Sequence, residues 1–237
     1  MVSKIVKRKR TKSFKKFIHL TIKPPIGKKS FIIKKSLDND RRTLPPLPSP
    51  NMKTVFLDLD DTLTHTTVSM LNQPPPEKFD FSFTTPDDDH RFVYYVRKRP
   101  FVDEFLNFLS ERFEIVVFTA GIQSYASAIL DRLDPTMNLI SHRLYRDSCT
   151  IINGKCVKDL SKTGRYMSRV VIVDDSPDSY LFQPGNAMPI QKFTNDDEDE
   201  ELSFLMPFFH VLASAQDARV ALKEYRTEVY GDDMDNM

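Results

Sequence analysis

Short apolar runs that end in polar residues recur along the chain. The runs are VFL at 55–57, EIVVF at 114–118 and RVVIV at 169–173. Such runs predict parallel strands that are buried on both faces, because half-exposed strands would alternate with polar residues. Amphipathic stretches lie between these strands and predict helices. We therefore expect an α/β fold with a doubly wound, mostly parallel sheet.

Two of the amphipathic stretches are clear. Pro100 is well placed as the first helical residue of the stretch that runs to 113, because its fixed φ suits the first helical turn. The apolar face of this helix is predicted to hold Phe101, Phe105 and Leu109. A second helix is predicted over 124–133, with Tyr125, Ile129, Leu130 and Leu133 on one face.

Two hairpins interrupt the alternation of strands and helices. Residues 65–99 carry FDFSF and RFVYYV around the polar turn PDDDH, which predicts a small β-hairpin insert after the first strand. Asn153-Gly154 lies between TII and KCV and is the preferred signal for a two-residue hairpin turn. The second hairpin delivers Lys158 directly after its second strand.

Charge is unevenly divided along the chain. Residues 1–50 hold 15 Lys/Arg and 2 Asp/Glu, whereas the remainder holds 19 basic and 31 acidic residues. With prolines at 45, 46, 48 and 50, this composition predicts a disordered basic arm and linker over 1–50, a folded domain over 51–230 and an acidic tail over 231–237. Nuclear import, contact with nucleic acid, a purely solvating role, and mitochondrial or plastid targeting all stay open for the arm.

Other features narrow the class of protein. Cys149 and Cys156 form no disulfide framework and no zinc pattern, so a reducing, intracellular compartment is expected. No run approaches the roughly 18 apolar residues of a membrane-spanning helix, which predicts a soluble protein. The acidic run at 195–201 precedes an apolar stretch and is interpreted as favourable charge at a helix N-terminus, with no catalytic role.

The first strand ends in a turn that carries two carboxylates. Asp58 and Asp60 flank one leucine, and Thr62 completes a D-x-D-x-T pattern. Carboxylates suit Mg²⁺ and also serve as phosphoryl acceptors, while a neighbouring acid can protonate a leaving oxygen. Alone, the pattern fits a simple capping cluster about as well.

Polar side chains also follow the other two strands. Thr119 follows the second strand, and Asp174 and Asp175 follow the third, while Lys158 adds a positive charge. Each is unremarkable alone, since threonines, lysines and paired aspartates are common at turns. The acids and the hydroxyl, however, end three successive strands of one sheet, where sites form in such folds. The combination predicts a Mg²⁺-dependent phosphatase with Asp58 as nucleophile.

The runs DLDDTL, VVFTAG, CVKDLS and VIVDDSP resemble the four motifs of the haloacid dehalogenase superfamily. With RKRPFVDEFL, RLYRDSC and MPFF, they resemble more narrowly its small C-terminal-domain phosphatase branch over residues 53–212. The resemblance implies roles for the residues already singled out. They are Asp58 as nucleophile, Asp60 as general acid/base, Thr119 and Lys158 as phosphate binders, and Asp58, the Asp60 carbonyl and Asp175 as Mg²⁺ ligands, with Asp174 and Thr62 in support.

The resemblance also implies a substrate. Members of the branch typically dephosphorylate serine or threonine in the tail of the largest subunit of RNA polymerase II and in related phosphoproteins, which implies a phosphorylated protein substrate. We expect a monomer located in the nucleus. The insert would form an apolar peptide groove, with Phe81, Ile122, Tyr125 and Arg146 as contacts. Many relatives carry Asn where Asp175 stands and Glu where Asp61 stands, and the insert differs. Alternatives are a non-catalytic peptide-binding subunit of translocase type and a lipid or small-molecule phosphatase.

Overall fold

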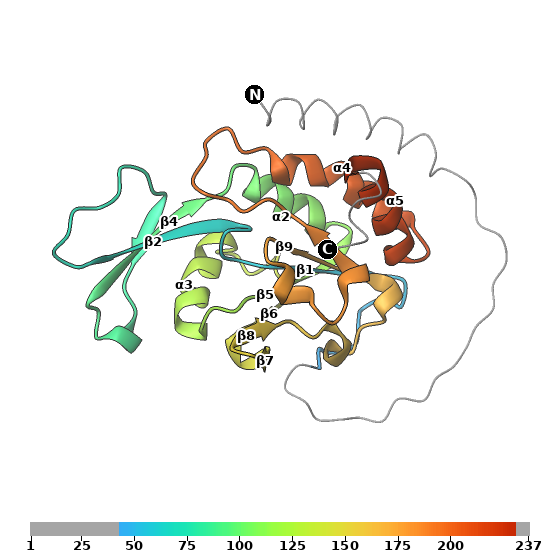
Figure 1. The fold of residues 1–237 in the computed structure, drawn as a ribbon, viewed down its shortest axis with the longest axis horizontal. Coiled ribbons are helices and arrows are strands. Elements are labelled where there is room, and N and C mark those ends of the chain that lie inside the picture. Colours follow the sequence, from blue (N-terminus) through green and yellow to red (C-terminus); the bar gives the residue numbers. More distant parts are fainter. Residues whose placement is uncertain (1–42, 231–237) are drawn as a thin grey trace.

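The computed structural model describes residues 43–230, and the predictions made for the basic arm up to residue 42 and for the tail at 231–237 lie outside this part. A five-stranded sheet forms the centre, with strand order β10-β9-β1-β5-β6 and parallel pairing throughout (Figure 1). Its strands are β1 (Lys53–Leu57), β5 (Phe113–Phe118), β6 (His142–Leu144), β9 (Val170–Asp174) and β10 (Ala187–Pro189). The predicted parallel α/β sheet is confirmed.

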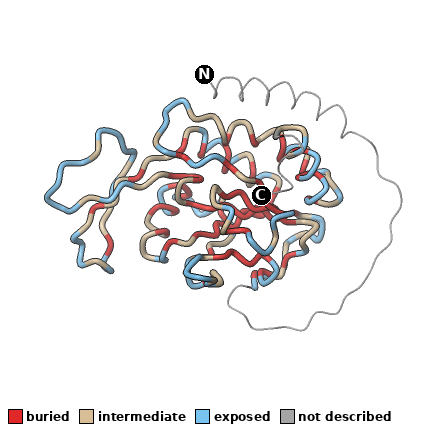
Figure 2. Tube along the Cα trace, in the orientation of Figure 1, coloured by how far each residue is buried: buried red, intermediate tan, exposed pale blue. Residues whose placement is uncertain are grey.

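Alternate side chains of the central strands enter two separate apolar clusters. Val55 and Leu57 belong to the larger cluster, whereas Phe56 belongs to the smaller one on the other face. The larger cluster also receives side chains from the four α-helices within residues 43–230, which are α2 (Val102–Ser110), α3 (Gln123–Leu133), α4 (Glu201–Ser214) and α5 (Ala218–Tyr230). Figure 2 shows burial concentrated in these strands and in the helices over them. Both faces are thus covered, as the continuous apolar runs require.

In the smaller cluster, strand side chains are covered by residues from loops and 3-10 turns. Leu160 and Tyr180 contribute from η3 (Leu160–Thr163) and η5 (Pro177–Tyr180), and Leu44 packs there as well. The backbone N–H of Leu44 donates to the carbonyl of Thr163 at 2.9 Å. Part of the proline-rich stretch that was predicted as a linker therefore packs against the folded domain.

The prediction for the first helix needs a correction at both ends. The helix begins at Val102, because Phe101 adopts a left-handed φ of 66° that ends the turn from the preceding strand, and Phe101 is 41% exposed. Phe113 starts β5 instead of ending the helix, since the apolar run that follows it is a strand. Pro100 consequently lies in the turn before the helix.

The insert after the first strand is a three-stranded antiparallel sheet rather than a simple hairpin. It consists of β2 (Thr64–Met70), β3 (Phe81–Phe83) and β4 (Phe92–Lys98) in the order β2-β4-β3, and it projects to one side of the core in Figure 1. The extra strand was missed because THTTVSM is polar, although its β-branched residues favour strand.

The second predicted hairpin is confirmed. Strands β7 (Thr150–Ile152) and β8 (Lys155–Val157) pair with Asn153 at φ 50° and Gly154 at φ 78°, the left-handed values that the two-residue turn requires. Within residues 43–230, no helix combines the length and the hydrophobicity needed to cross a bilayer.

Candidate active site

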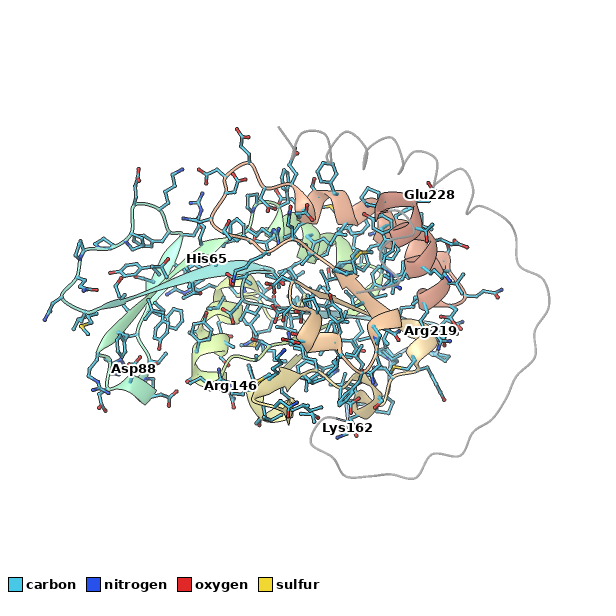
Figure 3. The ribbon with its side chains drawn as sticks, in the orientation of Figure 1. His65, Asp88, Arg146, Lys162, Arg219 and Glu228 are labelled. Carbon is cyan, nitrogen blue, oxygen red and sulfur yellow. The ribbon has the colours of Figure 1, made fainter. Side chains whose placement is uncertain are left out.

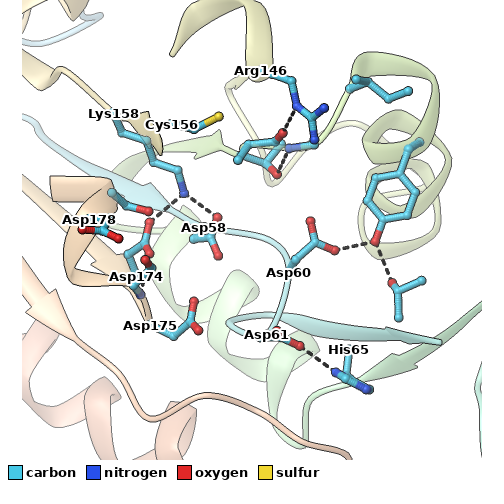
Figure 4. Close-up of a pocket in the computed structure, with 18 of the residues that line it drawn as sticks. Asp58, Asp60, Asp61, His65, Arg146, Cys156, Lys158, Asp174, Asp175 and Asp178 are labelled. Atoms are coloured by element: carbon cyan, nitrogen blue, oxygen red, sulfur yellow. Dashed lines mark hydrogen bonds and ion pairs between the residues drawn. The ribbon is translucent and has the colours of Figure 1, made fainter. Parts of the chain in front are cut away.

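The predicted site residues meet at the carboxyl edge of the sheet. Asp58 follows β1, Thr119 follows β5 and Asp174 ends β9, and β1 pairs with both of the other strands. Lys158 directly follows β8 and lies on the side of Asp58 away from Asp60 (Figure 4). The three polar clusters are therefore adjacent because the sheet is parallel and its strands end in register.

Lys158 is buried between two of the aspartates. Its ammonium donates to the carboxylate of Asp58 and to Oδ2 of Asp174 at 2.6 Å. Its backbone N–H donates to the carbonyl of Ser179 at 2.7 Å, which fixes the start of the side chain. Burial lowers the pKa of Lys158, but the Asp58 and Asp174 carboxylates raise it by a larger amount, so the net pKa lies above its ordinary value. The lysine is a permanent positive charge here.

The carboxylates outnumber this charge. Burial, with a smaller effect from the neighbouring Asp174 carboxylate, raises the pKa of Asp58 to about 8 despite the opposing effect of Lys158. Burial also raises the pKa of Asp175. Carboxylate oxygens of Asp58, Asp174 and Asp175 all lie within 4.8 Å of one another. Hard oxygen ligands crowded at this spacing with excess negative charge fit a divalent cation such as Mg²⁺.

Thr62 and Asp61 connect the first turn to the rest of the site. The Thr62 hydroxyl lies 3.5 Å from Oδ1 of Asp175 and donates toward it. Asp61 adopts a left-handed φ of 60° and accepts from Lys192 at 2.6 Å. His65 Nδ1 also lies 2.6 Å from the Asp61 carboxylate. Asp61 therefore holds the turn to β2 and to the segment after β10. The carboxylate of this turn that belongs to the cluster with Asp174 and Asp175 is that of Asp58.

Asp60 makes an interaction that the sequence did not indicate. The Tyr125 hydroxyl donates to Oδ1 of Asp60 and lies 2.7 Å from Oγ1 of Thr66. Figure 4 draws the hydrogen bond to Asp60 as a dashed line. Burial raises the pKa of Asp60, while the hydrogen bond from Tyr125 lowers it. A carboxyl group with a raised pKa suits proton transfer to and from oxygen. Tyr125, predicted as a peptide contact, thus also holds the candidate acid.

Thr119 presents a hydroxyl but not its backbone N–H. The N–H donates to the carbonyl of Leu144 at 2.9 Å, so it continues the sheet and is not available to a ligand. The hydroxyl oxygen accepts from the N–H of Gly121 at 2.9 Å, which leaves its own hydrogen free to donate. A Cβ at Gly121 would lie 3.1 Å from the Tyr125 ring and 3.2 Å from the Thr119 hydroxyl. Glycine permits this close approach.

An open pocket of about 720 Å³ lies over these residues. His65 and Arg146, which Figure 3 labels, line it together with Ile122 and Tyr125. Arg146 is exposed, and its Nε donates to the carbonyl of Ala120 at 2.6 Å. Three of the four predicted substrate contacts therefore border the pocket.

Phe81 is not among the residues that line this pocket. It pairs with Val96 near the base of the insert and packs on the core, with the Arg132 guanidinium 5.4 Å from its ring centre. Tyr94 borders the pocket instead, stacked on Phe83 at 5.2 Å between ring centres. The alternating pattern of the insert indicated aromatic residues but not which ring would reach the site.

Comparisons with known proteins point to one family. The family described as NLI interacting factor-like phosphatase matches residues 53–219. A "Probable C-terminal domain small phosphatase" of Dictyostelium discoideum is 45% identical over 175 residues, which cover 74% of this chain and 55% of that protein. A human "CTD small phosphatase-like protein" is 38% identical over 211 residues, covering 83% of this chain and 73% of that protein.

Solved structures agree with the fold. The fission yeast RNA polymerase II CTD phosphatase Fcp1, solved with beryllium fluoride, has a TM-score of 0.52 and 21% sequence identity, covering 78% of this chain and 55% of that one. At this identity the likeness supports the α/β architecture alone. The chain spans little more than half the length of the Dictyostelium relative and of this structure.

Proposed function

Because the chain belongs to the NLI interacting factor-like phosphatase family, we propose that it removes phosphate from serine or threonine side chains of proteins, with Asp58 as nucleophile and Mg²⁺ as cofactor. The observation that carries this proposal is the Asp58 carboxylate, held by the buried Lys158 at the floor of an open pocket and beside two further carboxylates. Relatives named as phosphatases of the RNA polymerase II tail make that tail the first substrate to test.

The chain's own residues suit two displacement steps. In the first, an Asp58 oxygen bonds to phosphorus, the bond to the serine or threonine oxygen breaks, and Asp60 gives its proton to that leaving oxygen. In the second, Asp60 takes a proton from water, whose oxygen bonds to phosphorus and releases Asp58 and inorganic phosphate. Lys158 and the Thr119 hydroxyl would contact the phosphoryl oxygens throughout.

The residues that would hold Mg²⁺ are Asp58, Asp175 and the backbone carbonyl of Asp60, with Asp174 and Thr62 in support. When bound, the cation neutralises phosphate charge and lets an anionic nucleophile approach. Lys158 is one positive charge beside three carboxylates, and the pKa of Asp58 is raised mainly by burial and in smaller part by the neighbouring Asp174 carboxylate.

A peptide substrate is supported by the shape of the site. The pocket is open and bordered by Ile122, Tyr125 and Tyr94, which offer apolar surface next to the catalytic turn. Arg146 at the rim offers a guanidinium to the peptide. We propose that phosphorylated peptide segments bind along this border, that the enzyme acts as a monomer in the nucleus, and that residues 51–230 form the catalytic domain.

Activity of Asp58→Asn tests the mechanism. We expect the wild-type protein to hydrolyse p-nitrophenyl phosphate and phosphoserine peptides only with Mg²⁺, and Asp58→Asn to lose both activities. Turnover by the variant at the wild-type rate would exclude Asp58 as nucleophile. Binding of phosphopeptide without hydrolysis by the wild-type protein would instead favour a peptide-binding subunit.

Peptide profiling tests the substrate class. Phosphoserine and phosphothreonine peptides with and without a neighbouring proline should exceed free phosphate esters in kcat/KM, and a preference for small esters or lipids would oppose the proposal. Deletion of residues 1–42 in a fluorescent fusion, which keeps the packed Leu44, would test whether the basic arm directs nuclear import. Retained nuclear enrichment would assign that role elsewhere.

A further inference from the structure

The segment between β10 and α4 lies across the turn that carries the candidate catalytic acids. Lys192 pairs with Asp61 at 2.6 Å, and the N–H of Phe193 donates to the Asp61 carbonyl at 2.7 Å. Further along, Asp197 pairs with Lys78 and Arg97 of the insert. In Figure 1 this orange stretch reaches from the core toward the base of the insert sheet. It therefore contacts both the catalytic turn and the insert.

One buried arginine joins the segment to the turn. The Arg99 side chain is 0% exposed, and its guanidinium binds both carboxylate oxygens of Asp199 at 2.8 Å. The same group donates to the carbonyl of Thr62 at 3.1 Å and to that of Gln191 at 2.7 Å. The Phe193 ring centre lies 5.4 Å from it. These contacts use the fork-shaped donor set that lysine lacks.

Asp199 is also fixed from its other side. Its Oδ1 accepts from the backbone N–H of Glu201, the first residue of α4, at 3.1 Å. The Asp199 carboxylate thus joins the guanidinium to the start of a helix that packs on α2 and the core. Asp199 therefore fixes Arg99 relative to α4 and the core.

The Arg99 contacts end at the candidate cation site. The Thr62 carbonyl that Arg99 holds belongs to the residue whose hydroxyl reaches Asp175. The backbone N–H of Arg99 donates to the Leu63 carbonyl at 3.0 Å, so the turn is held at two successive residues. Asp58 and Asp175 come from different strands, and their separation depends on how this turn sits.

We propose that Arg99 and Asp199 are positioning residues, which set the turn carrying Asp58 against Asp175 and thereby determine cation affinity. A buried ion pair contributes little net stability compared with apolar residues of similar volume, so stability alone explains it poorly. Residues that orient metal ligands without binding the metal typically change metal affinity or activity by roughly 10- to 100-fold when they are mutated. The inference rests on the cation site of the proposed function.

The chain contains a matched control pair. Arg165 binds both carboxylate oxygens of Glu114 at 2.7 and 2.6 Å, and both side chains are buried. Glu114 also accepts from the Thr54 hydroxyl near the start of β1, at the edge of the sheet opposite the site. The same chemistry is thus present where no cation ligand depends on it.

Cation binding is measured directly, without substrate. Tb³⁺ emission, sensitised by Tyr125 beside Asp60, is titrated in the full-length protein and competed with Mg²⁺. We expect Arg99→Lys and Asp199→Asn to weaken Mg²⁺ binding roughly 10- to 100-fold. Arg165→Lys and Glu114→Gln should stay within about twofold of wild type in Mg²⁺ affinity, although we expect thermal unfolding to find all four variants less stable.

Equal cation affinity in the two groups of variants would overturn the inference. So would loss of the folded state by both Arg99→Lys and Asp199→Asn, since the pair would then be only structural. Wild-type protein that binds Mg²⁺ but hydrolyses no phosphate ester would remove the proposed function and leave the positioning role intact. Wild-type hydrolysis with unchanged affinity in the variants would remove the positioning role alone.

Discussion

The candidate nucleophile should destabilise the metal-free protein that contains it. Asp58 is buried beside Asp174 and Asp60, and Lys158 provides the neighbouring positive charge. Replacing Asp58 by Asn removes an ionisable group whose charged form this buried site disfavours, and it keeps the side-chain volume. We therefore predict that Asp58→Asn abolishes activity and, without divalent cations, raises the stability of the folded protein.

The size of the effect follows from the pKa of Asp58, which rises from 3.8 to about 8 in the folded protein. Because the pKa of Asp58 is raised in the folded state, the stability that Asp58 contributes is fully present below about pH 4, where Asp58 is protonated in both states. That stability is lost as the pH rises toward 8. At pH 7 this loss spans about three pKa units, or about 4 kcal/mol at about 1.4 kcal/mol each. Asparagine binds Lys158 less well than a carboxylate does, so we expect a gain of about 2 to 4 kcal/mol.

Thermal unfolding in EDTA measures this gain. For a domain of this size, the expected increase in Tm is roughly 4 to 16 °C at pH 7, and it should shrink toward pH 5. Saturating Mg²⁺ should stabilise the wild type more than Asp58→Asn and narrow the difference. Asp178→Asn is the control, because Asp178 lines the same pocket but is about half exposed and should change stability little. A variant no more stable than wild type in EDTA at pH 7 would refute the reasoning.

Three further predictions address the acid, the core and a turn. Asp60→Asn should slow turnover by roughly 10²- to 10⁴-fold, and phosphate retained on Asp58 should be visible by mass spectrometry; normal turnover would assign the proton transfer to another group. Burial raises the pKa of Glu114, but the hydrogen bonds from Arg165 and Thr54 lower it by more, so the net pKa lies below its ordinary value. The ionised Glu114 therefore stabilises the fold above its unfolded pKa, and this stability is lost as the pH falls through the lowered folded pKa. Glu114→Gln should cost about 3 to 5 kcal/mol at pH 7 in a urea titration and less at pH 3, and equal losses at both pH values would contradict this. Gly154→Ala should cost about 1 to 2 kcal/mol through its positive φ alone, because no atom lies within 4 Å of the added Cβ; an unchanged urea midpoint would disprove that strain.

The sequence identified the sheet edge well because the signals there are local. Each buried strand is a continuous apolar run, and Asp58, Thr119 and Asp174 directly follow or end their runs. Parallel pairing then brings successive strand ends together without further information. Phe101 shows where local signals fail, since helical spacing placed it on the buried face although the chain turns there through a left-handed residue.

Contacts between distant segments could not be predicted. The bond from Tyr125 to Asp60 joins residues 65 positions apart and depends on how the insert and α3 pack around the turn. Helical periodicity correctly placed Tyr125 toward the interior, but it gives no partner for the hydroxyl group. Phe81 and Tyr94 likewise share an alternating pattern, and only the register of the insert decides that Tyr94 borders the pocket.

The acidic run at 195–201 shows why charge counts assign no roles. Glu201 lies in the first turn of α4, as the prediction of favourable charge at a helix N-terminus requires. Asp197 instead pairs at the surface with the insert, while Asp199 is largely buried against Arg99. Two acids two residues apart face two arginines, Arg97 and Arg99, that are also two residues apart. This register determines which acid is buried, and so one carboxylate of an ordinary acidic run contacts the arginine that holds the catalytic turn.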